Sequence, residues 1–301
     1  MNSSKLSLNP DRRRVLQAHL LFFVALILAG CHAATSNKST STGETAAARS
    51  TGDPIAGILL HVRDLLDAGQ ADSAIAVLRP RLLASAPMDP RLVRAMVIAY
   101  GAAGLYRDGM RIIDDLILFR SSDVNLHVAR GEIELQRHRP EVALRHFQRA
   151  ILIDDASPEA TGGFGRCRAL TGGNIDPALA FFDKLIKAKP TSPAARYGKA
   201  VLLLESGRVE KAVEDLRWVI GLNDELWQVE RDYGRALVRL SNRQGAIEHF
   251  EKAVRLLDGA GDPLMAERVA GELREAAEGA GDGTPPGGDE SPPAGKDEPQ
   301  G

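Results

Sequence analysis

The sequence predicts an all-α fold built from about six repeated helical hairpins and a capping helix at the C-terminal end. Aromatic residues make up only 5% of the 301 residues, whereas Ala, Leu and Arg are abundant. This composition suits packed helices better than a sheet, which requires more β-branched and aromatic side chains. A pattern of small and bulky apolar residues also recurs every 34 or 35 residues. A fixed period of this length is typical of repeat proteins, and it decides the fold class.

The second helix of each predicted hairpin is marked by a small residue at a fixed place. These residues are Ala74, Gly109, Ala143, Ala178, Ala212 and Ala246. A bulky apolar residue follows each of them four positions later, and a third member of the pattern follows three positions after that. Spacings of four and three place all three residues on one face of a helix. Glycine at 69, 104 and 207, five residues before the small residue, fits a tight turn between antiparallel helices.

This pattern resembles the tetratricopeptide repeat (TPR), whose 34 residues form one helix–turn–helix hairpin. The best match is 227–260, where Tyr233-Gly234, Ala246, Phe250 and Ala253 fall at signature positions. The resemblance covers residues 55–260 and implies a right-handed superhelical solenoid. Its six hairpins are expected at 55–89, 90–123, 124–157, 158–192, 193–226 and 227–260.

Residues 263–278 form a single amphipathic pattern after the last repeat. Asp262 is placed to cap a helix, and Pro263 suits the first turn. We expect a capping helix here, because a repeat array has to cover its last apolar face. Residues 279–301 contain mainly Gly, Pro and acidic side chains, a composition that predicts a disordered tail.

Two of the predicted hairpins depart from the pattern. Pro80 lies inside the second helix of 55–89 and should kink it. Gly162 and Gly163 lie inside the first helix of 158–192, where each costs about 0.5–1 kcal/mol relative to Ala. The sequence therefore predicts that 158–192 is the weakest part of the array.

Residues 1–30 are predicted to be an export signal. A basic segment, Arg12-Arg13-Arg14, precedes an apolar run from Leu20 to Leu28 that is too short to span a bilayer. The run ends in Leu28-Ala29-Gly30-Cys31, which resembles the lipobox of bacterial lipoproteins. The alternative is an ordinary signal peptide with a cysteine near its cleavage site. Whether export follows the general or the twin-arginine route stays open.

The lipobox resemblance implies that Cys31 is acylated and becomes the first residue of the mature protein. Palmitate-type chains on Cys31 would hold the chain to the lipid bilayer, with residues 31–54 as a flexible tether. His32 follows the cysteine, instead of the Asp that resembles an inner-membrane retention signal. We therefore expect an exported, periplasm-facing lipoprotein, at the outer membrane rather than the inner membrane if the host is Gram-negative.

No catalytic or metal-binding constellation is recognisable, so the sequence predicts neither an enzyme nor a cofactor. The histidines are spread over different repeats without metal-ligand spacing. Cys167 falls at a position that the repeat usually fills with a small buried residue, which indicates an inert core thiol. The formal net charge of −2 argues against nucleic acid as a partner.

The concave face of the array is the predicted binding site. In the family that the pattern resembles, this face is formed by positions 2, 5, 9 and 12 of each repeat. Candidate groove residues are Arg63, Arg91, Arg94, Asn125, Arg166, Tyr197, Arg231 and Arg235, with Glu132, Glu159 and Gln228 beside them. The excess of Arg suggests a partner segment that carries carboxylates. The alternative is that exposed helices of an Arg-rich protein simply carry Arg.

The organisation as a whole predicts a membrane-anchored scaffold or adaptor that binds other envelope proteins. It looks like lipid-anchored TPR proteins that assist assembly of a pilus or secretion complex, and a tight-adherence pilus is the first choice. An adaptor that recruits cell-wall enzymes is an alternative. A small-ligand receptor or an enzyme built on the same array is the alternative from a different class.

Overall fold

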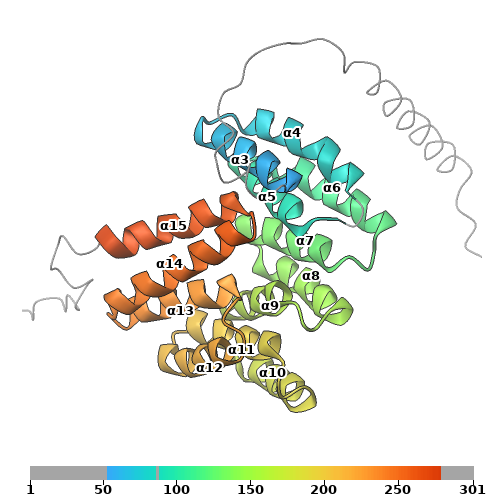
Figure 1. Cartoon of the computed structure of the whole chain (residues 1–301). Coiled ribbons are helices and arrows are strands. Elements are labelled where there is room, and N and C mark those ends of the chain that lie inside the picture. Colours follow the sequence, from blue (N-terminus) through green and yellow to red (C-terminus); the bar gives the residue numbers. More distant parts are fainter. Residues whose placement is uncertain (1–52, 86–87, 279–301) are drawn as a thin grey trace, which may run out of the picture. The chain divides into compact units, whose positions relative to one another are not determined.

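The computed structural model describes residues 53–85 and 88–278, which form thirteen helices and no strand (Figure 1). The predicted all-α fold of about six hairpins and a capping helix is confirmed. The predicted signal peptide, Cys31 and the acidic tail lie outside the described residues. Within those residues, no helix has the length and apolar character needed to cross a membrane.

Twelve of the helices pair into six successive hairpins, each with a first and a second helix. The first helices are α3 (Pro54–Asp67), α5 (Pro90–Ala102), α7 (Val124–Gln136), α9 (Pro158–Leu170), α11 (Pro193–Glu205) and α13 (Trp227–Arg239). The second helices are α4 (Ala71–Ala84), α6 (Tyr106–Phe119), α8 (Pro140–Ile153), α10 (Asp176–Ala188), α12 (Val209–Leu222) and α14 (Arg243–Gly259). The single helix α15 (Pro263–Glu278) follows them.

The periodic residues of the sequence pattern form the interior of the hairpins. The small residue of every second helix is buried, and so is the bulky residue four positions later. These bulky residues are Leu78, Ile113, Phe147, Phe182, Leu216 and Phe250. The pattern fails at Arg81, whose side chain is exposed and donates a hydrogen bond to the carbonyl of Val77. The helix α4 continues through Pro80 to Ala84.

The turn inside most hairpins is closed by one repeated motif. The backbone N–H of Gln70 bonds the carbonyl of Leu65, and the same six-to-one bond recurs in four further hairpins. This motif needs one residue in the left-handed conformation, which glycine adopts without strain. Gly69, Gly104 and Gly207 supply it with φ near 70–80°, whereas His138 and Ser241 adopt the same conformation as non-glycine residues.

The glycines of α9 are explained by close contact between helices. Gly162, Gly163 and Gly165 are all buried. A Cβ on Gly162 would lie 2.7 Å from the ring of Tyr197, and a Cβ on Gly163 would overlap the ring of Phe147. A Cβ on Gly165 would overlap the backbone carbonyl oxygen of Gly198 in α11. These residues are therefore small because α9 approaches its neighbours closely, and their cost to helix formation does not by itself make this hairpin weak.

The capping helix α15 connects both ends of the array. Its Leu264 belongs to the apolar core formed by the first three hairpins, whereas Met265 and Val269 belong to the core formed by the last two hairpins. Helix α15 accordingly packs along α14 and also contacts α3 (Figure 1). The first and last parts of the described chain are thus in contact, and they enclose the space between the first helices.

We predict that Gly165→Ala destabilises the fold although Ala is the better helix former. The new methyl group would meet the backbone of α11, which cannot move aside as a side chain could. Overpacking of this kind costs about 1–3 kcal/mol. The free energy of unfolding should fall accordingly in urea titrations followed by circular dichroism.

The matched control is Gly221→Ala, also inside a helix but with open space around its Cβ position. That change should leave stability unchanged or raise it by up to about 1 kcal/mol. Equal effects of the two substitutions would show that close packing is not the reason for the glycines.

Candidate functional site

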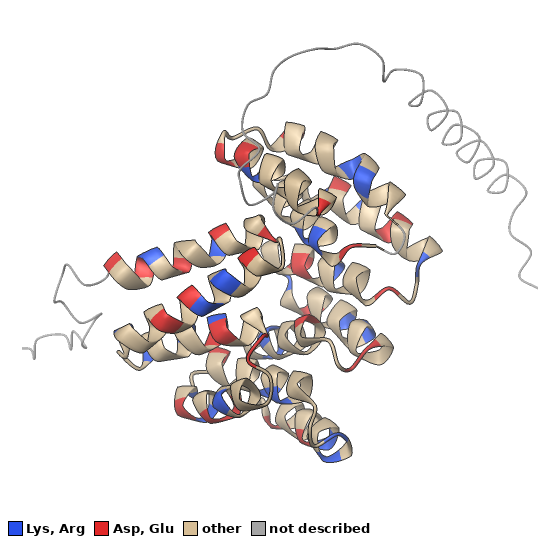
Figure 2. Cartoon of the chain, viewed as in Figure 1, with Lys and Arg blue, Asp and Glu red and all other residues tan. Residues whose placement is uncertain are grey.

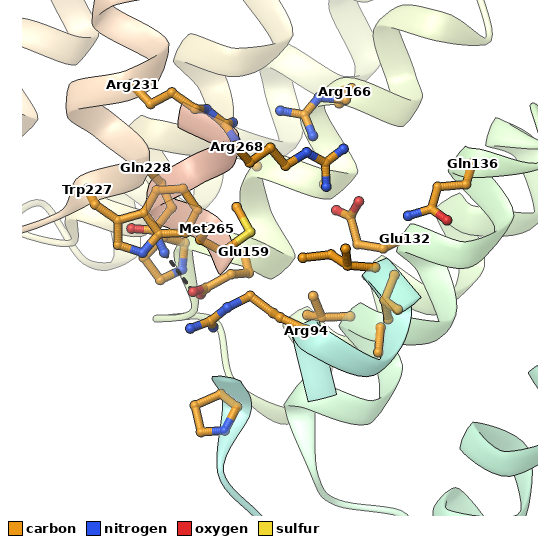
Figure 3. Close-up of a pocket in the computed structure, with 18 of the residues that line it drawn as sticks. Arg94, Glu132, Gln136, Glu159, Arg166, Trp227, Gln228, Arg231, Met265 and Arg268 are labelled. Atoms are coloured by element: carbon orange, nitrogen blue, oxygen red, sulfur yellow. Dashed lines mark hydrogen bonds between the residues drawn. The ribbon is translucent and has the colours of Figure 1, made fainter. Parts of the chain in front are cut away.

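A cavity of about 600 Å³ with a mixed charged and apolar lining lies among the first helices and α15 (Figure 3). Its walls come from α5, α7, α9, α11, α13 and α15. Five arginines and five glutamates line it, namely Arg94, Arg166, Arg231, Arg235, Arg268, Glu132, Glu159, Glu205, Glu272 and Glu275. Apolar side chains including Val93, Val97, Val128, Leu170 and Met265 lie between the charged groups.

Six of the eight groove residues proposed from the sequence lie in this wall. They are Arg94, Asn125, Arg166, Tyr197, Arg231 and Arg235. Glu132, Glu159 and Gln228, the other concave positions, also line it. Arg63 and Arg91 do not line the cavity. Arg63 forms an ion pair of 2.9 Å with Asp64 at the surface, so the repeat position alone does not determine which side chains face the cavity.

Arg91 joins the second hairpin to both ends of the described chain. Its guanidinium forms ion pairs with Asp89 at 2.7 Å and with Asp53 at 2.5 Å. The same group donates hydrogen bonds to the carbonyl oxygens of Ala260 and Gly261, at 3.0 and 3.3 Å. Arg91 thus binds the turn before α15 and holds it against α5, and all of these contacts are internal to the fold.

Arg94 makes the second contact with this turn. Its Nη2 lies 2.7 Å from Oδ2 of Asp262, a carboxylate that is almost fully buried. The other oxygen of Asp262 accepts the backbone N–H of Met265 and so caps α15. Arg94 therefore contributes to the cavity wall and at the same time stabilises the start of the capping helix.

Asp232 is the centre of a buried charged cluster behind the cavity wall. Arg231 and Arg235 form ion pairs with its Oδ1 at 2.8 and 3.2 Å, and the hydroxyl of Tyr197 donates to Oδ2 at 2.7 Å. Burial opposes ionisation of Asp232, but the neighbouring guanidinium groups outweigh it and hold the pKa of the carboxyl well below its usual value. Both arginines are thus already ion-paired within the fold.

The cationic bias expected from the first helices does not persist in the folded chain. Arg235 also contacts Glu205 at 3.1 Å, and Arg166 lies 3.6 Å from the same carboxylate. Acidic and basic residues are interspersed along α15 (Figure 2). Five arginines and five glutamates line the cavity, so its lining has no excess of positive charge.

Two contributions to the site were not predicted from the sequence: the side chains of α15 and the indole ring of Trp227. Arg268, Glu272 and Glu275 line the cavity from α15 (Figure 3 shows Arg268). The charged face of residues 263–278 was a visible signal, because these three residues are spaced four and three apart. A capping helix is usually expected to cover an end of the array, so nothing in the sequence placed this face over the concave side.

Cys167 is buried in the core of the third and fourth hairpins, as the sequence predicts. Burial raises the pKa of its thiol to about 12, so only a minute fraction is the reactive thiolate at neutral pH. The described residues contain no group of three or more His, Cys, Asp and Glu side chains arranged to hold a metal ion.

We predict that Asp232→Asn destabilises the protein by about 3–5 kcal/mol at pH 7, because it leaves Arg231 without its buried partner. A carboxyl whose pKa is lowered by folding stabilises the folded state above its unfolded pKa and loses this effect as the pH falls. The difference in unfolding free energy between parent and variant should therefore shrink from pH 6 to pH 3, as measured by urea titrations.

Asp108→Asn provides the control, since it removes a carboxylate from an exposed ion pair with Arg111. Its effect should stay within about 1 kcal/mol. A parent–variant difference at Asp232 that is independent of pH would contradict the assignment of a buried ionised carboxylate.

Two models of the tetratricopeptide repeat match the chain, over residues 169–216 and residues 197–263. Among solved structures, a tetratricopeptide-repeat protein from Parabacteroides merdae is 16% identical, with a TM-score of 0.38. The alignment covers 75% of this chain and 93% of that protein's chain. A thermophilic one from Thermus thermophilus is 15% identical over 73% and 97% of the two chains, with a TM-score of 0.40. The TPR2AB domain of yeast Sti1, in complex with pHSP90, is 14% identical over 74% and 99%, with a TM-score of 0.34. No curated protein sequence matches this chain.

Proposed function

This chain is a tetratricopeptide-repeat protein, and we propose that it is a lipid-anchored scaffold of the bacterial envelope that binds a segment of another protein in the cavity. The observation that carries the proposal is the cavity itself. Five first helices and the capping helix direct charged, amide and apolar side chains into one space. Such a wall offers many weak contacts for a chain segment.

The cavity wall is rigidly supported, which favours a binding role. Tyr197 and Arg231 are fixed by Asp232, and Gln228 donates a hydrogen bond of 2.6 Å to Glu159 (Figure 3). Side chains that are already ordered lose little conformational entropy when a ligand binds. The side chains of the site are therefore preorganised for binding.

Lipid anchoring is proposed from the sequence Leu28-Ala29-Gly30-Cys31 alone. An acylated Cys31 would connect the repeat array to the membrane through residues 31–54. We further propose that the array faces the periplasm, at the outer membrane in a Gram-negative host, and that its partners are envelope proteins. Assembly of a pilus or secretion complex is the process we favour, and recruitment of cell-wall enzymes is the alternative.

A small-ligand receptor is the second candidate, and one observation favours it. Arg91 and Arg94 hold the turn before α15 against α5, so the cavity is bounded by contacts between distant parts of the chain. Its volume of about 600 Å³ falls within the range of small-molecule sites. The cross-linking experiment below separates this candidate from a protein partner.

We predict that a photo-reactive amino acid at Leu170 captures a protein partner in living cells. Leu170 lines the cavity with 57% of its surface exposed, so a bulky substitute fits there without disturbing the core. The covalent adduct should appear as a band of higher mass in immunoblots and be identified by mass spectrometry.

The matched control is the same amino acid at Leu118, which is 79% exposed on the second helix α6 and does not line the cavity. Capture from Leu118 and none from Leu170 would place the partner outside the cavity. Absence of a protein adduct at both positions, together with retention of a small molecule by the purified protein, would favour the receptor.

We predict that Cys31→Ser abolishes fatty-acid labelling and releases the protein from membranes. Only the thiol of Cys31 follows the lipobox pattern, and two or more acyl chains suffice for stable attachment where one is marginal. Metabolic labelling with a fatty-acid analogue and fractionation of the cells measure both effects. The control is Cys167→Ser, which should keep the label; label that survives Cys31→Ser would refute acylation at this site.

A further inference from the structure

Not all charged groups of the cavity form ion pairs, and most of those that do not are carboxylates. We propose that the cavity binds a cationic group, namely the lysine or arginine side chains of a partner segment. The inference deepens the proposed scaffold function and rests on it. It also reverses the expectation from the sequence, which favoured a carboxylate-bearing partner.

The arginines of the wall are almost fully occupied by the chain's own carboxylates. Arg231 and Arg235 bind Asp232, and Arg94 binds Asp262. Arg166 lies near Glu205. Among the described residues, only Arg268 of the five arginines has no ion pair within 4 Å. An acidic ligand would have to compete with Asp232, a fully buried carboxylate, which would then lose its charge partners.

Several carboxylates of the wall, in contrast, have no cation within ion-pair distance among the described residues. Within the described part of the chain, Glu132, Glu272 and Glu275 form no ion pair, and Glu159 is bound only by the neutral side chains of Gln228 and Ser157. Burial raises the pKa of Glu272, although Arg231 and Arg235 act in the opposite direction. A cation placed near Glu272 would favour its ionised form.

Two buried amide oxygens add a requirement for hydrogen-bond donors. Gln228 is 7% exposed, and its Oε1 has no hydrogen-bond partner; the Oε1 of Gln136 is also buried without one. Both side chains line the cavity. A buried acceptor without a donor is unfavourable. Guanidinium and ammonium groups carry only donors, so they suit the free carboxylates of the lining and add no further unpaired acceptor.

The positions of these acceptors fit more than one cationic side chain. Glu132 and Gln136 lie on α7 with a spacing of four residues, which places them on the same face of the helix. Glu159 and Gln228 are linked to each other on α9 and α13 (Figure 3). The cavity therefore has two separate groups of acceptors, so a segment with two basic residues matches it better than a single cation does.

The test uses the full-length protein in detergent and three fluorescent twelve-residue peptides of Gly and Ser. The basic peptide carries four residues that are Lys or Arg, and the acidic peptide carries four that are Asp or Glu. The neutral peptide carries four Gln residues. Fluorescence anisotropy at low salt gives the affinities, and the basic peptide should bind at least tenfold more tightly than the acidic one. Preference for the acidic peptide, or no binding of the basic one, would overturn the inference.

Two double variants decide whether the cavity is responsible. Glu132→Gln with Glu272→Gln removes two free carboxylates while keeping their size, and should weaken binding of the basic peptide at least tenfold, since charged hydrogen bonds are individually strong. Glu214→Gln with Glu251→Gln makes the same change of net charge at exposed positions outside the cavity and should have little effect. Equal effects of the two double variants would overturn the inference.

Failure of this inference is distinguishable from failure of the scaffold function. If the protein partner is captured through Leu170 but the acidic peptide binds best, the scaffold function stands and the cationic preference is wrong. Arginine amide is titrated alongside the peptides. If it binds as tightly as the basic peptide, the cationic chemistry is retained and the small-ligand receptor replaces the scaffold.

Discussion

The contact between Arg91, Arg94 and the turn before α15 is the interaction on which the candidate site depends. A stack of helical hairpins needs only neighbouring contacts, and its two ends are usually far apart. Here Arg91 donates to the carbonyls of Ala260 and Gly261, and Arg94 binds Asp262. These bonds orient α15 along the concave side, where it forms one wall of an open cavity.

Burial changes the electrostatics of the charged groups that lie behind the cavity wall. A carboxylate removed from water is stable as an ion only if cations or donors replace its hydration. Asp232 meets this condition through Arg231, Arg235 and Tyr197. Most arginines of the cavity are consequently bound within the folded structure, and the groups left unpaired are mainly carboxylates.

Much of the fold could be predicted because its signals are local. The small residue at Ala143 and the ring of Phe147 lie one helical turn apart, and Gly104 lies in the turn that its sequence position indicates. Local spacing is readable without knowledge of the tertiary structure. The small size of Gly165 had a non-local cause, because the atom that excludes a side chain there belongs to Gly198 in another hairpin.

The candidate site was only partly predictable for the same reason. Repeat positions indicated Arg94, Tyr197 and Arg231 as concave residues, and the structure places them in the cavity wall. Their partners could not be inferred, since the Arg94–Asp262 pair joins residues 168 positions apart. Neighbours on a helix such as Arg231 and Asp232 are also not expected to face each other. Counting charges at repeat positions therefore could not show which of the charged groups are already paired within the fold.

Arg94 influences both the position of α15 and the charge of the cavity wall. A substitution of Arg94 alone therefore cannot separate these two effects. Arg94 lies in the cavity wall and also binds the capping residue of α15. Its removal would expose the site and leave Asp262 buried without a cation, so loss of binding would have two explanations. Glu132 on α7 and Glu272 further along α15 take part in none of the bonds to the turn. Substitutions at Glu132 and Glu272 can therefore test the charge preference of the ligand without displacing α15.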